Sequence, residues 1–134
     1  MSKMKGENVK YSQFYLSNNE GKSNCVIRTF CKIFQEKYES VYIDLCLIAK
    51  RLGFSSFNDV QVFEAYMEQH DTILINYGNG VKIKDLNLNA GTYAVFCWDK
   101  KEFYHMVPII DNILYDKNDE SLELYTISIY KKIK

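Results

Sequence analysis

The apolar residues of this chain recur at helical spacing before about residue 72 and at alternate positions after it. The first part therefore predicts helices and the second part predicts short strands. The expected helices cover residues 24–36, 41–53 and 58–69. The expected strands cover residues 72–77, 92–98, 102–110, 113–115 and 124–130. Helices followed by an antiparallel sheet indicate the α+β class.

Size and composition fit a single domain. The chain has 134 residues, of which 47% are hydrophobic, and this is enough for one core. Lys and Arg together number 17, as do Asp and Glu, so no net charge attracts nucleic acid. We expect one domain over residues 1–134, with the polar residues 1–22 as an N-terminal arm that has room for a short strand.

The N-terminal residues lack the apolar segment of a signal peptide, and no apolar run reaches the ~18 residues of a membrane span. We therefore expect a cytoplasmic protein with no membrane partner, located in the bacterial host cell if a phage encodes it.

The cysteines of a cytoplasmic protein are expected to be reduced. They are Cys25, Cys31, Cys46 and Cys97. Their spacing contains no metal-binding pair, so neither a metal nor another cofactor is predicted.

One cysteine stands where the first helix should begin. Cys25 follows Ser23 and Asn24, either of which can cap a helix. The unpaired N–H groups of a first helical turn lower the pKa of a thiol, and Arg28 adds positive charge one turn later. Cys25 is therefore a candidate nucleophile. The alternative is a small buried residue, as free cysteines often are.

A histidine and a carboxylate are expected on the same face of the sheet. If residues 111–112 form a two-residue hairpin turn, Ile110 pairs with Ile113. By the same count Asp116 lies diagonal to His105, with roughly 7–8 Å between the Cα atoms, so their side chains can meet. A thiol nucleophile needs such a base, oriented by such a carboxylate.

This register has alternatives. A slip of one residue would turn Asp116 to the other face, and Pro108 in the same strand predicts an edge or a bulge. Taken singly, His105 also fits a histidine whose ring nitrogens form hydrogen bonds at the surface of a sheet. Asp116 taken singly fits a turn or strand-end residue. The hypothesis of a catalytic site depends on the three positions together.

Two segments resemble motifs of small phage and bacterial papain-like proteins. Residues 24–30, with the sequence Asn-Cys-Val-Ile-Arg-Thr-Phe, resemble the N-C-V-x-R-A-[LF] start of their nucleophile helix. Residues 91–93 and 105–116 resemble their G-T-Y…H-x-V-x-V-I-D-G-x-x-Y-D pattern. The resemblance implies a papain-like cysteine protease fold, in which the nucleophile helix packs on an antiparallel sheet. It also implies three roles: Cys25 as nucleophile, His105 as base and Asp116 as orienting acid.

An acyl-transfer site also needs donors for the oxyanion. The backbone N–H of Cys25 is one, and papain-like enzymes use a side-chain amide shortly before the nucleophile as another. Asn19 and Asn24 are the candidates, although loop asparagines also serve simply as turn formers.

We expect a thiol-dependent hydrolase, a cysteine peptidase or amidase, with a peptide or protein substrate. Deamidase or transferase chemistry would use the same residues. The alternative is a catalytically inactive papain-like scaffold that acts as a phage-type binding or inhibitor protein.

Overall fold

The computed structural model describes residues 8–14, 16, 24–76 and 80–133, which form helices packed on a six-stranded sheet. The helices in this part of the chain are α1 (Cys25–Phe34), α2 (Tyr38–Leu52) and α3 (Val60–Gln69). The strands are β1 (Lys10–Gln13), β2 (Thr72–Asn76), β3 (Thr92–Trp98), β4 (Tyr104–Ile110), β5 (Ile113–Asp116) and β6 (Tyr125–Lys132). Two short 3-10 helices are η2 (Ile83–Asp85) and η3 (Asp119–Glu123). The predicted α+β class is confirmed.

The second helix begins earlier than expected. It starts at Tyr38 rather than after Ser40, because the N–H of Val41 already bonds to the carbonyl of Lys37 at 3.1 Å. It ends at the expected place. Gly53 has a φ of 88°, in the left-handed region that glycine adopts without strain at the end of a helix.

The sheet is mixed rather than purely antiparallel, in the order β1-β5-β4-β3-β6-β2. The N-terminal arm contributes the short strand β1, which runs parallel to β5, so only the prediction of a purely antiparallel sheet is wrong at this edge. The N–H groups of Lys10 and Phe14 bond to the carbonyls of Asn112 and Asp116 at 3.0 and 2.8 Å. A strand that arrives from a distant part of the chain is not held antiparallel by a hairpin turn.

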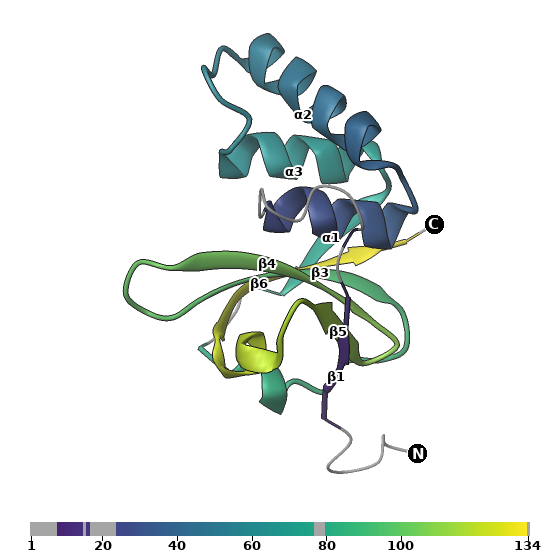
Figure 1. Ribbon diagram of the computed structural model, residues 1–134, viewed down its shortest axis with the longest axis vertical. Helices are drawn as coiled ribbons and strands as arrows, with labels where there is room; N and C mark the ends of the chain where they lie inside the picture. Colours follow the sequence, from purple (N-terminus) through teal and green to yellow (C-terminus); the bar gives the residue numbers. More distant parts are fainter. Residues whose placement is uncertain (1–7, 15, 17–23, 77–79, 134) are drawn as a thin grey trace.

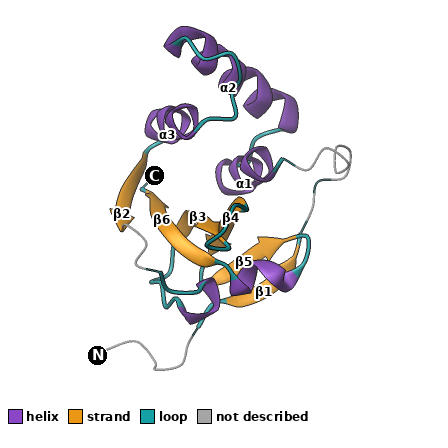
Figure 2. Ribbon diagram, turned by 90° about the vertical axis from the view of Figure 1, so that its left-hand side faces the viewer, coloured by secondary structure: helices purple, strands orange, loops and turns teal. Residues whose placement is uncertain are grey.

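Apolar residues cover both faces of the sheet. Helix α1 lies next to the sheet, with α3 and α2 farther out (Figure 1). The core on this side includes Ile27, Phe30, Leu45, Val62, Tyr66, Ala94 and Met106. The 3-10 helices lie on the other side (Figure 2). The core there includes Ile83, Val95, Cys97, Val107, Ile109 and Leu114. The central strands β3 and β4 are thus packed from both sides, which makes them a rigid support for a site.

A two-residue turn sets the register between β4 and β5. Asp111 and Asn112 have φ values of 50° and 68°, as a type I′ turn requires at both central positions. Ile110 pairs with Ile113, so the predicted register is confirmed at this pair. The side chain of Asp111 also accepts the N–H of Gly91 at 3.0 Å, which holds the turn against the start of β3.

Pro108 ends the pairing between β4 and β5. In this register the main-chain groups of Pro108 and Met106 point towards β5, and Pro108 has no N–H to donate. The ladder accordingly stops at the Ile109–Leu114 pair. The predicted bulge is wrong, because β4 pairs with β3 without a shift. The predicted edge is confirmed locally, because residues 104–108 of β4 have no partner in the β5 ladder. Beyond Pro108, this edge of β4 is open to another element.

Candidate functional site: a thiol, an imidazole and a carboxylate

The candidate nucleophile is the first residue of helix α1. Asn24 caps the helix, and its side-chain oxygen accepts the N–H of Ile27 at 3.0 Å. Cys25 therefore lies beside the N–H groups of the first turn, as predicted. These groups form the positive end of the helix dipole, which favours a thiolate over a thiol.

Helix α1 occupies the edge of β4 that Pro108 leaves open. The N–H of Met106 bonds to the sulfur of Cys25. The carbonyl of Met106 accepts the hydroxyl of Thr29 at 3.0 Å. Cys25 and Thr29 are four residues apart and lie on the same face of the helix. Side chains of one helix thus satisfy both main-chain groups of Met106, and this contact places the thiol beside His105.

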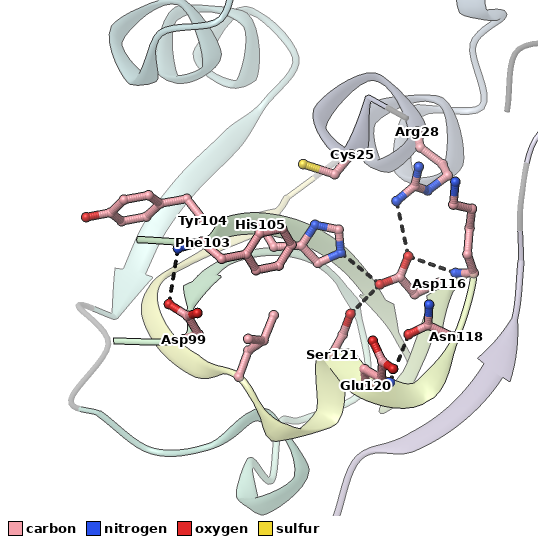
Figure 3. Close-up of a pocket in the computed structure, with 12 residues that line it drawn as sticks. Cys25, Arg28, Asp99, Phe103, Tyr104, His105, Asp116, Asn118, Glu120 and Ser121 are labelled. Atoms are coloured by element: carbon pink, nitrogen blue, oxygen red, sulfur yellow. Dashed lines mark hydrogen bonds and ion pairs between the residues drawn. The ribbon is translucent and has the colours of Figure 1, made fainter. Parts of the chain in front are cut away.

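His105 lies between Cys25 and Asp116 (Figure 3). Its Nε2 is 2.8 Å from Oδ2 of Asp116, and its ring also bonds to the sulfur of Cys25. Because Nε2 faces the carboxylate, Nδ1 is the ring nitrogen that remains for the thiol. The structure therefore brings together the three side chains that the sequence marks as candidates.

Four described groups bond to the carboxylate of Asp116. Its Oδ1 accepts from the guanidinium of Arg28 at 3.1 Å and from the backbone N–H of Lys117 at 2.8 Å. Its Oδ2 accepts from His105 and from the hydroxyl of Ser121. Asp116 is only 4% exposed. A buried carboxylate bonded on both oxygens keeps one orientation, so it also fixes the orientation of the His105 ring.

These contacts favour the charged forms of the thiol and the imidazole. Burial raises the pKa of Cys25, but the hydrogen bond and charge of His105, the Met106 N–H and the Arg28 charge together lower it. Burial lowers the pKa of His105, but the hydrogen bonds with Asp116 and Cys25 raise it to about 9. The contacts therefore favour a thiolate paired with an imidazolium.

Asp116 is the anionic end of this arrangement. Burial raises its pKa, but hydrogen bonds from His105 and Ser121 and the charge of His105 outweigh burial, and the pKa falls to about 2. The carboxylate consequently stays ionised at any pH near neutrality.

The titration of His105 tests the ion pair directly. The midpoint of its imidazole Cε1 proton, followed by NMR, is expected near pH 9, so the imidazolium persists until the pH rises through that value. Asp116→Asn and Cys25→Ser should each move the midpoint to lower pH, because each removes a bond that favours the charged ring. A wild-type midpoint near 6.5, the ordinary value for histidine, would contradict the ion pair.

The other described cysteines line neither pocket at the thiol, although the thiol of Cys97 donates a hydrogen bond to the carbonyl of His105 at 3.4 Å. Burial raises the pKa of Cys31 to about 11, and burial together with the charges of Cys25 and Asp116 raises that of Cys97 well above its usual range. Cys46 lies on α2 and contacts Tyr42. Cys25, in contrast to Cys31 and Cys97, has surroundings that lower its pKa.

The two oxyanion candidates have different outcomes. Asn19 lies outside the described residues. Asn24 lies next to the thiol, but its side-chain oxygen is used as the helix cap. Its side-chain NH₂ group is the part of the amide that is chemically able to donate to an oxyanion.

Three side chains support the site in ways that the sequence did not predict. Arg28 was noted only as a charge near the thiol, but it forms a buried ion pair with Asp116. Thr29 anchors the helix to β4. The four-residue spacing between Cys25 and Thr29 is the signal in the sequence, because residues four apart lie on the same face of a helix. Ser121 comes from η3, and no motif in the sequence marks it.

Two pockets share Cys25, Tyr104 and His105 as lining residues. The first, which we call the polar pocket, has a volume of about 500 Å³. It adds the charged residues Arg28, Asp99, Asp116, Lys117 and Glu120. The second, which we call the apolar pocket, has a volume of about 540 Å³. It adds Asn24, Val26, Asn58, Val60, Phe63 and Phe96. Both pockets thus leave space beside the thiol for a small group.

Comparisons with protein-family models, with curated proteins and with solved structures find no match to this chain.

None of the helices in the described segments has the length and apolar character that a membrane span needs. Within the same segments, no three side chains of the His, Cys, Asp or Glu type lie together as a metal site requires.

Proposed function

We propose that this protein is a thiol-dependent hydrolase, a cysteine peptidase or amidase built on a papain-like fold. The observation that carries the proposal is the position of His105, which bonds to the thiol of Cys25 on one side and to the carboxylate of Asp116 on the other. Cys25 acts as nucleophile, His105 as acid and base, and Asp116 holds the ring.

The reaction follows from the charged state of the pair. The Cys25 thiolate attacks the carbonyl carbon of the substrate, and the electron pair of the C=O bond moves to oxygen. When the C–N bond breaks, the His105 imidazolium gives its proton to the leaving amine and a thioester remains. His105 then takes a proton from water, whose oxygen attacks the thioester. The C–S bond breaks, the acid leaves, and the thiolate and imidazolium are restored.

The oxyanion forms at the start of helix α1. The backbone N–H of Cys25 is one donor for it, and the side-chain NH₂ of Asn24 is a second candidate. Asn19 remains a candidate on the sequence alone. Both Cys25 and Asn24 line the apolar pocket, so this pocket opens onto the side of the thiol where the carbonyl oxygen would lie.

Selective alkylation tests the proposal. Iodoacetamide at pH 6, followed by mass spectrometry of each cysteine, is expected to modify Cys25 at least about tenfold faster than Cys46, which serves as an internal control on α2. Incubation with a peptide library should then give cleavage that Cys25→Ala abolishes. Alkylation of Cys25 no faster than Cys46, or cleavage that survives Cys25→Ala, would contradict a thiol hydrolase.

A catalytically inactive papain-like scaffold, acting as a phage-type binding or inhibitor protein, is the second candidate. One observation favours it: apolar side chains are exposed on α2, at Ile43 and Leu47, and on the edge strand β2, at Ile73 and Ile75. Rapid alkylation of Cys25 together with no cleavage of any library peptide would support this candidate over the hydrolase.

A further inference from the structure

The apolar pocket has the size and surface of a site for an uncharged group. Its volume of about 540 Å³ lies in the ~300–1,000 Å³ range of pockets that hold small ligands. Val60 and Phe63 of α3 and Phe96 of β3 contribute apolar walls. Apart from Cys25 and His105, which line both pockets, the described lining contains no charged side chain: it has no Asp, Glu, Lys or Arg. A charged group packed against these three walls would lose water without gaining a partner of opposite charge from them.

Apolar side chains are also exposed at this pocket. Val60 is 43% exposed and Tyr104 is 52% exposed. The Tyr104 ring stacks on Phe96, with 5.8 Å between the ring centroids, which gives the pocket an aromatic wall. Exposed apolar groups that gather around a concave surface beside reactive side chains are typical of a ligand site. An apolar group of the substrate would cover this surface.

The polar pocket differs in charge. Asp99 and Glu120 contribute carboxylates, and Lys117 contributes a cation. One oxygen of Asp99 already accepts three backbone N–H groups in the turn between β3 and β4. Apart from Cys25 and His105, which both pockets share, the lining therefore changes from uncharged to charged across the thiol. A substrate that passes over Cys25 meets two environments, and only the apolar pocket discriminates strongly against charge.

We propose that the apolar pocket selects substrates with an apolar side chain next to the bond that Cys25 attacks. The substrate class is thus a peptide or amide with an aromatic or aliphatic residue on one side of that bond and a polar residue on the other. This inference rests on the proposed function for the identity of the attacking group. The shape and charge of the pocket themselves do not depend on catalysis.

Electrophiles with different side arms test the selection. Iodoacetamides with a phenylethyl arm and with an aminoethyl arm are compared for their rate of reaction at Cys25, each normalised to its rate with a free model thiol. The phenylethyl compound is expected to react about tenfold faster, as the burial of an apolar ring predicts. Val60→Glu should remove or reverse this preference, because it adds a carboxylate to the pocket.

Leu47→Glu is the matched control. Leu47 is 57% exposed on α2 and lines neither pocket, so this variant should keep the preference of the wild type. If Cys25 reacts rapidly with plain iodoacetamide but shows no preference for the phenylethyl arm, the proposed selection by the apolar pocket is wrong. The proposed hydrolase function is not contradicted by that result. A preference that Val60→Glu leaves unchanged would overturn the selection as well.

A second measurement does not need a reactive thiol. The unreactive N-(2-phenylethyl)acetamide is expected to shift the NMR signals of the Val60 methyl groups and to leave those of Leu47 in place. If Cys25 proves unreactive, so that the hydrolase fails, these shifts would still support the binding site. If no shift occurs at Val60, the apolar pocket is not a binding site, whatever the thiol does.

Discussion

His105→Ala is expected to lower the rate of Cys25 alkylation at pH 6 by at least about 100-fold. His105 provides the hydrogen bond and the charge that lower the pKa of the thiol, while burial acts in the opposite direction. Without the imidazole, burial prevails and the protonated thiol becomes the stable form at this pH. The measurement is the pH dependence of alkylation, which should shift to higher pH in the variant. Cleavage of any substrate should be lost with it.

His70→Ala is the control for this variant. The chain has two histidines, and His70 lies at the end of α3, where its Nδ1 is 2.8 Å from the carbonyl oxygen of Tyr66. His70 lines neither pocket at the thiol, so its replacement should leave the alkylation rate of Cys25 close to that of the wild type. Equal effects of the two variants would show that the thiol does not depend on the imidazole of His105.

Arg28→Met is expected to destabilise the fold by about 3 kcal/mol, because it removes one of the two cations that compensate the buried carboxylate of Asp116. Arg28 and Asp116 are 6% and 4% exposed and are joined at 3.1 Å. Met fills similar space but offers no positive charge. For a chain of this length the loss corresponds to a fall in Tm of about 10 °C, measured by thermal unfolding followed by circular dichroism. Arg28→Lys should retain part of the stability.

Lys82→Met supplies the comparison with an exposed ion pair. Lys82 is joined to Glu123 at 3.0 Å, nearly the same distance as in the buried pair, but Glu123 is largely exposed to solvent. Exposed pairs contribute little to stability, so this variant should unfold close to the wild-type temperature. A loss for Arg28→Met no larger than that for Lys82→Met would show that the buried pair does not stabilise the fold.

Local patterns were sufficient to predict the main elements and the approach of the three candidate side chains. The position of Cys25 at a helix start follows from the cap at Asn24. The reach from His105 to Asp116 follows from the two-residue turn, because the turn sets which strand residues lie opposite each other. Both inferences concern neighbours within one helix or one hairpin, where spacing in the sequence translates into distance.

Local sequence patterns do not predict contacts between segments that are far apart in the chain. Nothing near Arg28 in the sequence indicates that its partner is Asp116, 88 residues later. The same holds for Thr29 and the carbonyl of Met106. Pro108 was interpreted by the general rule for strands, which predicts an edge or a bulge. Its actual effect is to end the pairing between β4 and β5 early. The main-chain groups of β4 that are left without a strand partner are contacted by α1, and the sequence does not indicate this contact.

The distance along the chain between Arg28 and Asp116 has a consequence during translation. A ribosome makes Cys25 and the three helices before it makes either the imidazole or the carboxylate of the site. In the unfinished polypeptide this cysteine lacks the partners that lower its pKa, and it meets them only after they leave the exit tunnel and join the sheet. The proposed role of Cys25 thus depends on one of the last segments to be synthesised.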